Sequence, residues 1–306
     1  MKIIVTTTIH HPTKAIALFD ALEDWLLIVV GDKKTPEDYR LERGTYVSPA
    51  DQERYDKALS DAIGWNCIQR RNFGMLMAYD MGADVIATVD DDNIPYDAWG
   101  SDLLLGREVE VDHYEIPESV FDPLSVTNHS ELWHRGYPLQ LLSLRNSHKP
   151  IRKKICAHVQ ADFWNGDPDV DAICRFEHAP VCNFDPIYFP FASNRPSPFD
   201  SQNTFLLPEV LPHYFIMPHV GRMDDIWPSY YVQAKGHSVV YGKPSVFQDR
   251  HEQDLNKNMR DEYLGYEKNL QLVQDLAVDT ERLYWYLPSE ASRAFDLFRR
   301  HFGAAV

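Results

Sequence analysis

The segment "KIIVTTTIHHPTKAIALFDALEDWLLIVVGD" (residues 2–32) decides the fold class. Residues 2–9 are mostly apolar and β-branched without polar alternation, which predicts a strand buried on both faces. Residues 12–24 begin with a proline that a first helical turn permits, and their apolar side chains have helical spacing, at Ala15, Leu18, Phe19 and Leu22. Residues 25–32 form a second apolar run that ends in Gly-Asp. A strand, a helix and a strand in this order predict a parallel βαβ unit.

The same alternation continues to "DVIATVDDDNIPY" (residues 84–96). Helical patterns at residues 49–62 and 66–81 precede an apolar strand at residues 84–90. We therefore expect an α/β fold in which helices flank a mainly parallel central sheet. Ligands are expected at the carboxyl ends of the strands.

The second part of the chain has a different character. Residues 100–220 are rich in proline, aromatic residues and histidine, which predicts irregular backbone packed over the sheet, on the substrate side of a cleft. An apolar run at residues 238–248 precedes an amphipathic helix at about 252–277 and a helical segment at about 289–302. We expect the middle segment to set acceptor specificity through Trp164, Asp167, Asp169 and Asp171.

The composition excludes several function classes. Lys and Arg total 30 and Asp and Glu total 46, so the formal net charge is −16. That charge opposes nonspecific binding to nucleic acid or anionic membranes, and an anionic substrate needs local arginines or a metal ion. No apolar run approaches the ~20 residues of a membrane span, and the apolar stretch near the N-terminus is too short for a signal peptide. The 4 cysteines form no CxxC pair, which indicates free thiols. We expect a cytoplasmic protein without a membrane span or a nucleic-acid partner.

Three adjacent aspartates, Asp90, Asp91 and Asp92, follow the third predicted strand. A turn is one interpretation, because Asp-Asn-Ile-Pro is common turn chemistry. A turn requires one aspartate, however, and three like charges at the end of a core strand call for a positive partner. Mn²⁺ or Mg²⁺ supplies it, since these ions bind one or two carboxylates together with phosphate oxygens. Alternate residues of an extended segment face the same way, so Asp90 and Asp92 are the predicted metal pair, and Asp91 is predicted to contact a ribose or orient the turn.

Two adjacent arginines, Arg70 and Arg71, precede this strand in an acidic chain. They are candidates for binding a diphosphate, and a solvated helix face that pairs with nearby acids is the alternative. Thr7 lies near the end of the first predicted strand, and Asp32 ends the second. Asp32 can accept hydrogen bonds from a ribose or a base. Together these residues predict one nucleotide-binding cleft.

A second acidic pair, Asp224 and Asp225, lies in "RMDDIWPSYYVQ" (residues 222–233). A carboxylate here can deprotonate an acceptor hydroxyl, and we prefer Asp225 for this role, with Asp224 as the alternative. An N-cap on the following short helix is the structural interpretation of the same residues. Farther along, Arg250 is predicted to contact phosphate. His251 is a predicted third metal ligand, with a surface or capping role as its alternative.

With these motifs the chain resembles the STELLO-type glycosyltransferase-like domain of plants and its bacterial and animal relatives. The resemblance covers residues 1–100 and 220–270 and rests on "IIVTTTIHHPTKAIALFDALEDWLLIVVGDKKTP", "RRNFGMLMAYDMGADVIATVDDDN", "DDIWPSYYVQ" and "RHEQDLNKNMRDEYLGYEKN". It implies a GT-A fold, which is a Rossmann-like nucleotide-sugar domain with a D-x-D metal site. It also implies UDP as the nucleotide.

The chain is more distantly similar to the reversibly glycosylated polypeptides, which are UDP-arabinopyranose mutases. The shared features are the triple aspartate, "RGYP" (residues 135–138), "NGDPDVDA" (residues 165–172) and "DDIW" (residues 224–227). In those mutases an arginine a few residues after "RGYP" carries the sugar covalently. The corresponding spacing falls on Leu142 here, and Arg145 requires a shift of three residues. A turn is an equally available interpretation of "RGYP".

Three functions remain open from the sequence. The first is a metal-dependent glycosyltransferase that uses a nucleotide-diphospho-sugar, with UDP expected, and a sugar or glycan acceptor. Residues 1–250 would form its GT-A domain, with a nucleotide-binding half (1–100) and a sugar and acceptor half (101–250), and residues 251–306 would form a C-terminal helical extension packed on that domain. The second is a nucleotide-sugar pyranose/furanose mutase with Arg145 as the sugar carrier. The third is a non-catalytic nucleotide-sugar-binding scaffold; self-association into a homo-oligomer is left open for each.

Overall fold

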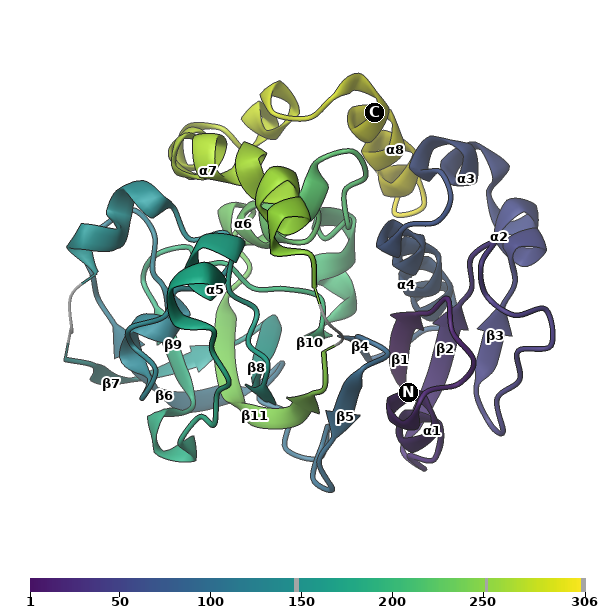
Figure 1. Ribbon diagram of the computed structural model, residues 1–306, viewed down its shortest axis with the longest axis horizontal. Helices are drawn as coiled ribbons and strands as arrows, with labels where there is room; N and C mark the ends of the chain where they lie inside the picture. The colour runs from purple at the N-terminus through teal and green to yellow at the C-terminus, as the bar shows by residue number, and fades with distance from the viewer. Residues whose placement is uncertain (146–148, 251–252, 304–306) are drawn as a thin grey trace.

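The computed structural model describes residues 1–145, 149–250 and 253–303 (Figure 1). Within these residues an eleven-stranded sheet crosses the molecule, with helices packed around it. The strand order is β3-β2-β1-β4-β10-β8-β11-β9-β6-β7, and β5 pairs with β11 off this path. The predicted α/β class, with a large, mainly parallel central sheet, flanking helices and helices near the C-terminal end, is confirmed.

The N-terminal half of the sheet is parallel. Its strands are β1 (Lys2–Thr7), β2 (Trp25–Val30), β3 (Thr45–Val47) and β4 (Val85–Val89). The interiors of β1, β2 and β4 are almost fully buried, which is why their sequences are continuous apolar runs rather than alternating ones. Parallel pairing brings the carboxyl ends of these strands to one edge of the sheet.

The middle segment contributes five of the eleven strands, so the prediction of irregular backbone over residues 100–220 is wrong for these strands. Its strands are β6 (Glu108–Tyr114), β7 (Ile151–Cys156), β8 (Val159–Gly166), β9 (Phe191–Ser193) and β10 (Asn203–Leu206). β10 runs antiparallel between β4 and β8, and β8 is parallel to β11 (Val239–Gln248). The short β5 (Asn93–Pro95) is antiparallel to β11. The carboxyl ends of β4, β8 and β11 and the amino end of β10 therefore meet at one edge.

Three helices of the N-terminal half begin at polar caps. Thr13 caps α1 (Lys14–Asp20), and Ser48 forms a capping box at α2 (Pro49–Tyr55). The predicted helix at residues 49–62 is divided at Asp56, whose side chain accepts from Leu59 N at 2.9 Å and starts α3 (Lys57–Ile63). The predicted helix at residues 66–81 is a short 3₁₀ turn, η1 (Ile68–Arg70), followed by α4 (Arg71–Asp80).

Gly74 lets α4 lie close to the sheet. A Cβ atom at this position would come within 2.4 Å of Val5 Cγ1 on β1 and 2.8 Å of Val30 Cγ2 on β2. Only glycine fits that separation without displacing the helix. Arg71, three residues earlier on the same helix, is thereby held beside the sheet edge that follows β4.

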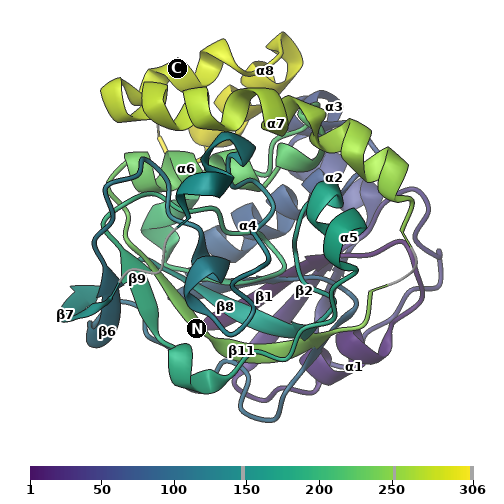
Figure 2. The ribbon, with the colours of Figure 1, turned by 60° about the vertical axis from the view of Figure 1, so that its left-hand side comes forward.

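The C-terminal helices pack against both halves of the molecule. α7 (Leu255–Val278) contacts α5 (Ala172–His178) and α6 (Ile226–Ala234), and α8 (Ser289–Arg300) contacts α3. Figures 1 and 2 show α7 and α8 on the same side of the molecule as α6 and α3. The remaining 3₁₀ turns are η2 (Pro123–Val126), η3 (Leu139–Leu144), η4 (Pro186–Tyr188), η5 (Pro208–His213), η6 (Gly221–Met223) and η7 (Thr280–Trp285). None of the helices in the described ranges has the length and apolar character needed to cross a membrane.

Candidate functional site

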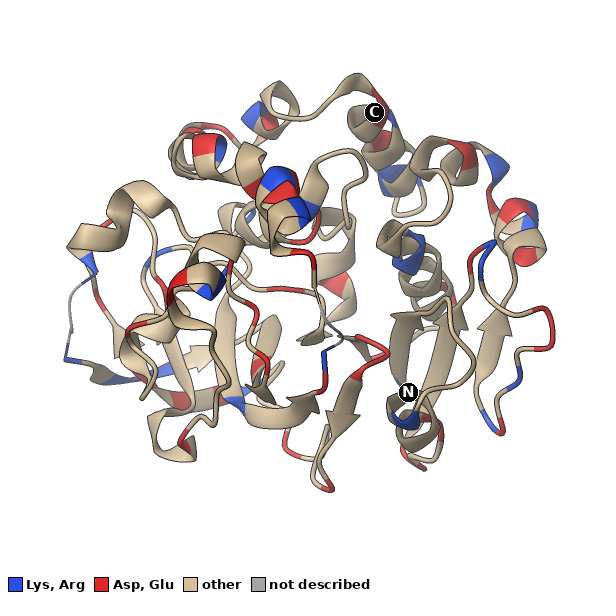
Figure 3. Ribbon diagram, viewed as in Figure 1, with Lys and Arg blue, Asp and Glu red and all other residues tan. Residues whose placement is uncertain are grey.

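An acidic cavity of about 300 Å³ lies at the sheet edge where β4, β8 and β11 end and β10 begins. Figure 3 shows acidic positions along the loop that joins β4 to β5. Six aspartates and three arginines line the cavity: Asp90, Asp92, Asp169, Asp200, Asp224, Asp225, Arg135, Arg222 and Arg250. They come from segments far apart in the chain that the sheet topology brings together.

The three adjacent aspartates have three different partners. Asp90 Oδ1 accepts from Arg71 Nη2 at 2.6 Å, and Asp91 Oδ2 accepts from the Thr8 hydroxyl at 2.6 Å. Asp92 Oδ1 accepts from Gln248 Nε2 at 2.7 Å. Asp90 and Asp92 line the acidic cavity, whereas Asp91 lines a neighbouring pocket. Burial and the neighbouring Asp90 raise the pKa of Asp92 to about 6.

The neighbouring pocket has a volume of about 270 Å³ and gathers the residues predicted to bind a nucleotide. Ile68 lines both this pocket and the acidic cavity, so the two spaces are adjacent. Asp32 accepts from Lys33 N at 2.6 Å and from Cys67 N at 3.0 Å, which fixes its carboxylate at the pocket wall. Among the predicted residues, the pocket is lined by Thr7, Asp32, Arg70 and Asp91.

Arg70 and Arg71 have different environments. Arg70 is fully buried, donates from Nε to Gln52 Oε1 at 2.7 Å and from Nη2 to the Ser60 hydroxyl at 3.0 Å, and lies over the Trp65 ring at 3.7 Å. Burial lowers the pKa of Arg70 to about 10. These contacts occupy its guanidinium with groups of the protein itself. Arg71 is the arginine that reaches the acidic loop.

Arg135 connects the two acidic segments of the cavity. Its Nε donates to both carboxylate oxygens of Asp169 at 3.0 Å, and its Nη1 donates to Asp225 Oδ1 at 3.0 Å. Asp225 Oδ2 also accepts from the backbone N–H of Ser201 at 2.9 Å. Burial disfavours the Asp225 carboxylate, but Arg135 and the Ser201 N–H outweigh burial and hold its pKa below the ordinary value.

Asp224 is the less strongly bound member of its pair. Its carboxylate accepts from Gln69 Nε2 at 2.8 Å. Burial and the adjacent Asp225 raise the pKa of Asp224 to about 7. Neither aspartate makes a side-chain N-cap hydrogen bond at the start of α6. A carboxyl that titrates near neutrality and lines a cavity has the properties of a general base.

The other predicted site residues lie in different places. Arg250 lines the acidic cavity and donates from Nη2 to Gln202 Oε1 at 3.1 Å, while His251 lies outside the described residues. Arg145 Nε lies 2.7 Å from Asp122 Oδ2, and its Nη2 donates to the Ser130 carbonyl at 3.0 Å. The structure therefore does not bring Arg145 to the acidic cavity; it lines a separate small pocket with Asp122.

Sequence reasoning missed several cavity residues. Arg135 lies within "RGYP", which was considered only as a family feature or a turn, and Asp200 lies in a proline-rich segment without periodicity. Asp169, one of the residues expected to set acceptor specificity, pairs with Arg135 at the cavity wall. Asp171 caps α5 through Cys174 N, and its Oδ2 accepts from Trp133 Nε1 at 2.7 Å.

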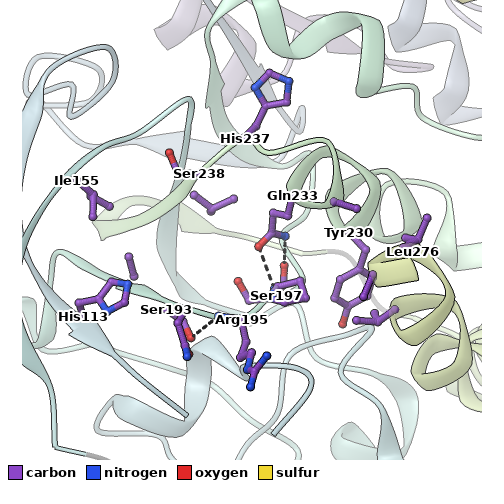
Figure 4. Close-up of a pocket in the computed structure, with 17 residues that line it drawn as sticks. His113, Ile155, Ser193, Arg195, Ser197, Tyr230, Gln233, His237, Ser238 and Leu276 are labelled. Atoms are coloured by element: carbon purple, nitrogen blue, oxygen red, sulfur yellow. Dashed lines mark hydrogen bonds between the residues drawn. The ribbon is translucent and has the colours of Figure 1, made fainter. Parts of the chain in front are cut away.

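A second cavity of about 300 Å³ lies beside α6 and α7 (Figure 4). Its lining contains no aspartate or glutamate among the described residues, and Figure 4 shows Gln233 hydrogen-bonded to Ser197. Without carboxylates it lacks the ligands of a hard divalent cation. Among these cavities, the acidic one therefore offers the carboxylates that a hard divalent cation requires.

Comparisons with known proteins agree with the sequence motifs. No protein-family model matches the chain. Two proteins of Arabidopsis thaliana are similar: "Probable glycosyltransferase STELLO2", 23% identical over 185 residues (56% of this chain), and "Probable glycosyltransferase STELLO1", 23% identical over 188 residues (57% of this chain). The chain covers 24% of the length of each of these relatives.

Among solved structures, glucosyl-3-phosphoglycerate synthase of Mycobacterium tuberculosis has a distantly similar chain path. Its complex with phosphoglyceric acid aligns with a TM-score of 0.44 and 11% identity over 90% of this chain and 80% of that chain. Its complex with uridine diphosphate aligns with a TM-score of 0.43 over the same shares of the two chains. The predicted resemblance to the STELLO-type proteins is confirmed at the level of sequence.

Proposed function

We propose that this protein is a metal-dependent glycosyltransferase of GT-A type that uses a UDP-sugar donor and an acceptor hydroxyl. The observation that carries the proposal is the excess of carboxylates in the acidic cavity, directly beside a pocket that is lined by Thr7, Asp32 and Asp91. The names of the similar plant proteins support the reaction class.

The charges of the cavity call for a cation. Three of its six aspartates have no arginine or lysine nitrogen within 4.0 Å in the part of the chain that the structure describes: Asp92, Asp200 and Asp224. Like charges in a shared, partly buried space repel each other unless a positive group compensates them. A divalent ion supplies that charge, and carboxylate oxygens are the ligands that Mn²⁺ and Mg²⁺ prefer.

The residues present fit a metal-bound diphosphate. Asp92, which has no arginine partner, and Asp90, which shares its charge with Arg71, would hold the ion, with His251 as the proposed third ligand. When bound, Mn²⁺ or Mg²⁺ stabilises the negative charge that develops on the leaving nucleotide. Arg250, at the same cavity, can contact a phosphate oxygen.

The neighbouring pocket would receive the nucleoside. Asp32 presents a fixed carboxylate that can accept hydrogen bonds from a ribose or a base, and Asp91 lines the same pocket. Thr7 lines the same pocket. Because Ile68 borders both spaces, a nucleoside in this pocket would extend its diphosphate toward Asp92.

Asp224 is the better candidate for the acceptor base. Asp225 is hydrogen-bonded to Arg135 and Ser201, and its lowered pKa makes it a weak base. Asp224, with its pKa raised to about 7, can take a proton from an acceptor hydroxyl near neutral pH. Arg135 and Asp225 would then position Asp224 rather than react themselves.

Calorimetric titration with UDP tests the proposal. The wild-type protein should bind UDP much more tightly with Mn²⁺ than without it, and Asp92→Asn should lose most of this metal dependence. Asp97→Asn removes an exposed carboxyl close in sequence and is the matched control, which should bind as the wild type does. Equal UDP affinity with and without Mn²⁺ would contradict the metal role. A scaffold is favoured instead if the wild-type protein transfers no sugar and Asp92→Asn leaves UDP binding unchanged.

A further inference from the structure

A second group of side chains that can bind a metal lies at the wall of the acidic cavity, apart from the aspartates that follow β4. His134, Asp169 and Asp200 each offer one ligand atom, and these atoms all lie within 4.8 Å of one another. The three residues are only 1%, 1% and 4% exposed. They come from three separate chain segments, which the sheet edge brings together.

The hydrogen bonds of His134 determine which ring nitrogen is available. Its Nδ1 lies 2.6 Å from the backbone carbonyl oxygen of Arg135. A carbonyl oxygen only accepts, so Nδ1 carries a proton, and Nε2 is the ring nitrogen that can bind a metal ion once the ring is neutral. Metal-binding histidines in proteins are oriented in this way, by donating their other N–H to a carbonyl or carboxylate.

Asp200 presents an unsatisfied oxygen to that nitrogen. Its Oδ1 accepts from Gln202 N at 3.0 Å, whereas its buried Oδ2 has no hydrogen-bond partner among the described residues. Oδ2 lies 3.7 Å from His134 Nε2, which is too far for a hydrogen bond. His134 Nε2 and Asp200 Oδ2 therefore face each other at the separation that two ligands of one ion adopt, since ligand bonds of about 2.0–2.2 Å place neighbouring ligands roughly 3–4 Å apart.

Asp169 completes the group and limits its charge. It is paired with Arg135, and Arg222 Nη2 and Arg250 Nη2 lie 3.7 Å and 3.9 Å from its Oδ1. These arginines offset the Asp169 carboxylate, so an ion here would draw most of its stabilisation from His134 and Asp200. A ligand set that contains an imidazole favours Mn²⁺ or Zn²⁺ over Mg²⁺.

We propose that His134, Asp169 and Asp200 bind a divalent transition-metal ion that is distinct from the ion proposed for Asp90 and Asp92. Asp169 and Asp200 line the acidic cavity, so the ion would keep coordination positions open toward it. The proposal concerns only the binding of this ion, and it does not depend on the proposed glycosyltransferase activity.

Anomalous scattering from the wild-type protein tests the site directly. Crystals of the full chain grown with MnCl₂, and in parallel with ZnCl₂, should show an anomalous peak in contact with His134 Nε2 and Asp200 Oδ2. Absence of a peak there with both metals would overturn the proposal and leave a protonated His134 paired with Asp200. This measurement requires no variant and therefore does not depend on how a substituted protein folds.

Metal content after loading and desalting provides the second measurement. His134→Gln and Asp200→Asn should each lose one equivalent of metal relative to the wild type, whereas Asp92→Asn should keep that equivalent. His113→Gln and Asp162→Asn replace a buried histidine and a buried aspartate outside the group and should leave the content unchanged. Unchanged content in both His134→Gln and Asp200→Asn would overturn the inner site. A loss confined to those two variants, with none in Asp92→Asn, would support the inner site and contradict the metal role in the proposed function.

Discussion

Arg71 donates from Nη2 to Asp90 Oδ1 across 2.6 Å, from a side chain that is only 1% exposed. Its Nη1 donates to the carbonyl and the hydroxyl of Ser201 at 2.8 Å. The first aspartate of the triplet therefore has a fixed cation in the folded protein. The pair also joins α4 to the segment that leads into β10, so it contributes to the fold as well as to the charge of the cavity.

Replacing Arg71 should destabilise the protein. Arg71→Ala leaves the Ser201 groups and Asp90 without their donor, and we expect a loss of about 3 kcal/mol of unfolding free energy in chemical denaturation. Arg71→Lys keeps the positive charge but not the several N–H donors of the guanidinium, so the loss of unfolding free energy should be smaller. Arg54→Ala is the control, because Arg54 pairs with Asp51 on the surface and should change stability by less than about 1 kcal/mol. An unchanged free energy of unfolding in Arg71→Ala would mean that the pair does not stabilise the fold.

Arg135 and Asp225 should behave as one energetic unit. Their hydrogen bonds couple the segment that precedes η3 to the start of α6, so a double-mutant cycle of Arg135→Met and Asp225→Asn should give a coupling free energy of about 2 kcal/mol. Arg135→Met combined with Asp162→Asn is the reference cycle, since the two residues share no partner, and its effects should add within about 0.5 kcal/mol. Additive effects in the first cycle would show that the two side chains act independently.

The continuous β-branched runs made much of the N-terminal half of the sheet predictable. The middle strands were missed for two reasons. β9 and β10 are only 3 and 4 residues long, and β10 exists as a strand because β4 and β8 supply its hydrogen bonds. β6 did carry a readable signal, because its buried Val109 and Val111 alternate with exposed glutamates.

The candidate site divides in the same way. Asp90 and Asp92 could be recognised because they follow a core strand directly. Arg135 could not be recognised in this way, because its partner Asp225 lies 90 residues away in sequence. A local sequence pattern does not predict an ion pair between distant segments. The choice between Asp224 and Asp225 likewise depends on which carboxylate Arg135 reaches.

The buried Asp162 should make stability depend on pH. Burial raises the pKa of Asp162 to about 7. Lys243 favours the charged form of this carboxyl, whereas Asp102 disfavours it. An unfolded aspartate titrates near pH ~3.9, so between about pH 4 and pH 7 the folded chain keeps a proton that the unfolded chain has lost. The contribution of Asp162 to stability is therefore fully present below pH ~4 and decreases until the pH passes ~7.

Asp162→Asn removes this dependence. Relative to the wild type, its unfolding free energy should rise between pH 4 and pH 7 by up to about 4 kcal/mol, measured by urea denaturation at several pH values. Gln160 Nε2, which donates to Asp162 Oδ1 at 2.8 Å, can donate equally to the amide oxygen. Asp97→Asn controls for removal of an exposed carboxyl. A constant difference between variant and wild type would show that Asp162 is ionised throughout this range.

Arg145 distinguishes a transferase from a mutase. Its guanidinium is paired with the buried Asp122 away from the acidic cavity, so we expect neither a sugar adduct by intact mass nor an isomeric nucleotide sugar when the protein is incubated with UDP-sugars alone. Arg145→Ala should instead cost about 3–5 kcal/mol of stability, because it leaves the Asp122 charge buried without its partner. A sugar adduct in the wild type that disappears in Arg145→Ala would favour the mutase.

Gly74 gives control over the cavity from a distance. A methyl group at this position would push α4 outward from β1 and β2, and Arg71, fixed to the same helix, would move with it. Arg71 would then offset less of the Asp90 charge, so Asp90 would attract a bound cation more strongly, although no ligand had been altered. The distance between α4 and the sheet, which Gly74 sets, would thus influence the metal affinity of a site that Gly74 does not contact. Metal binding could then be altered by repacking this helix instead of replacing the metal ligands.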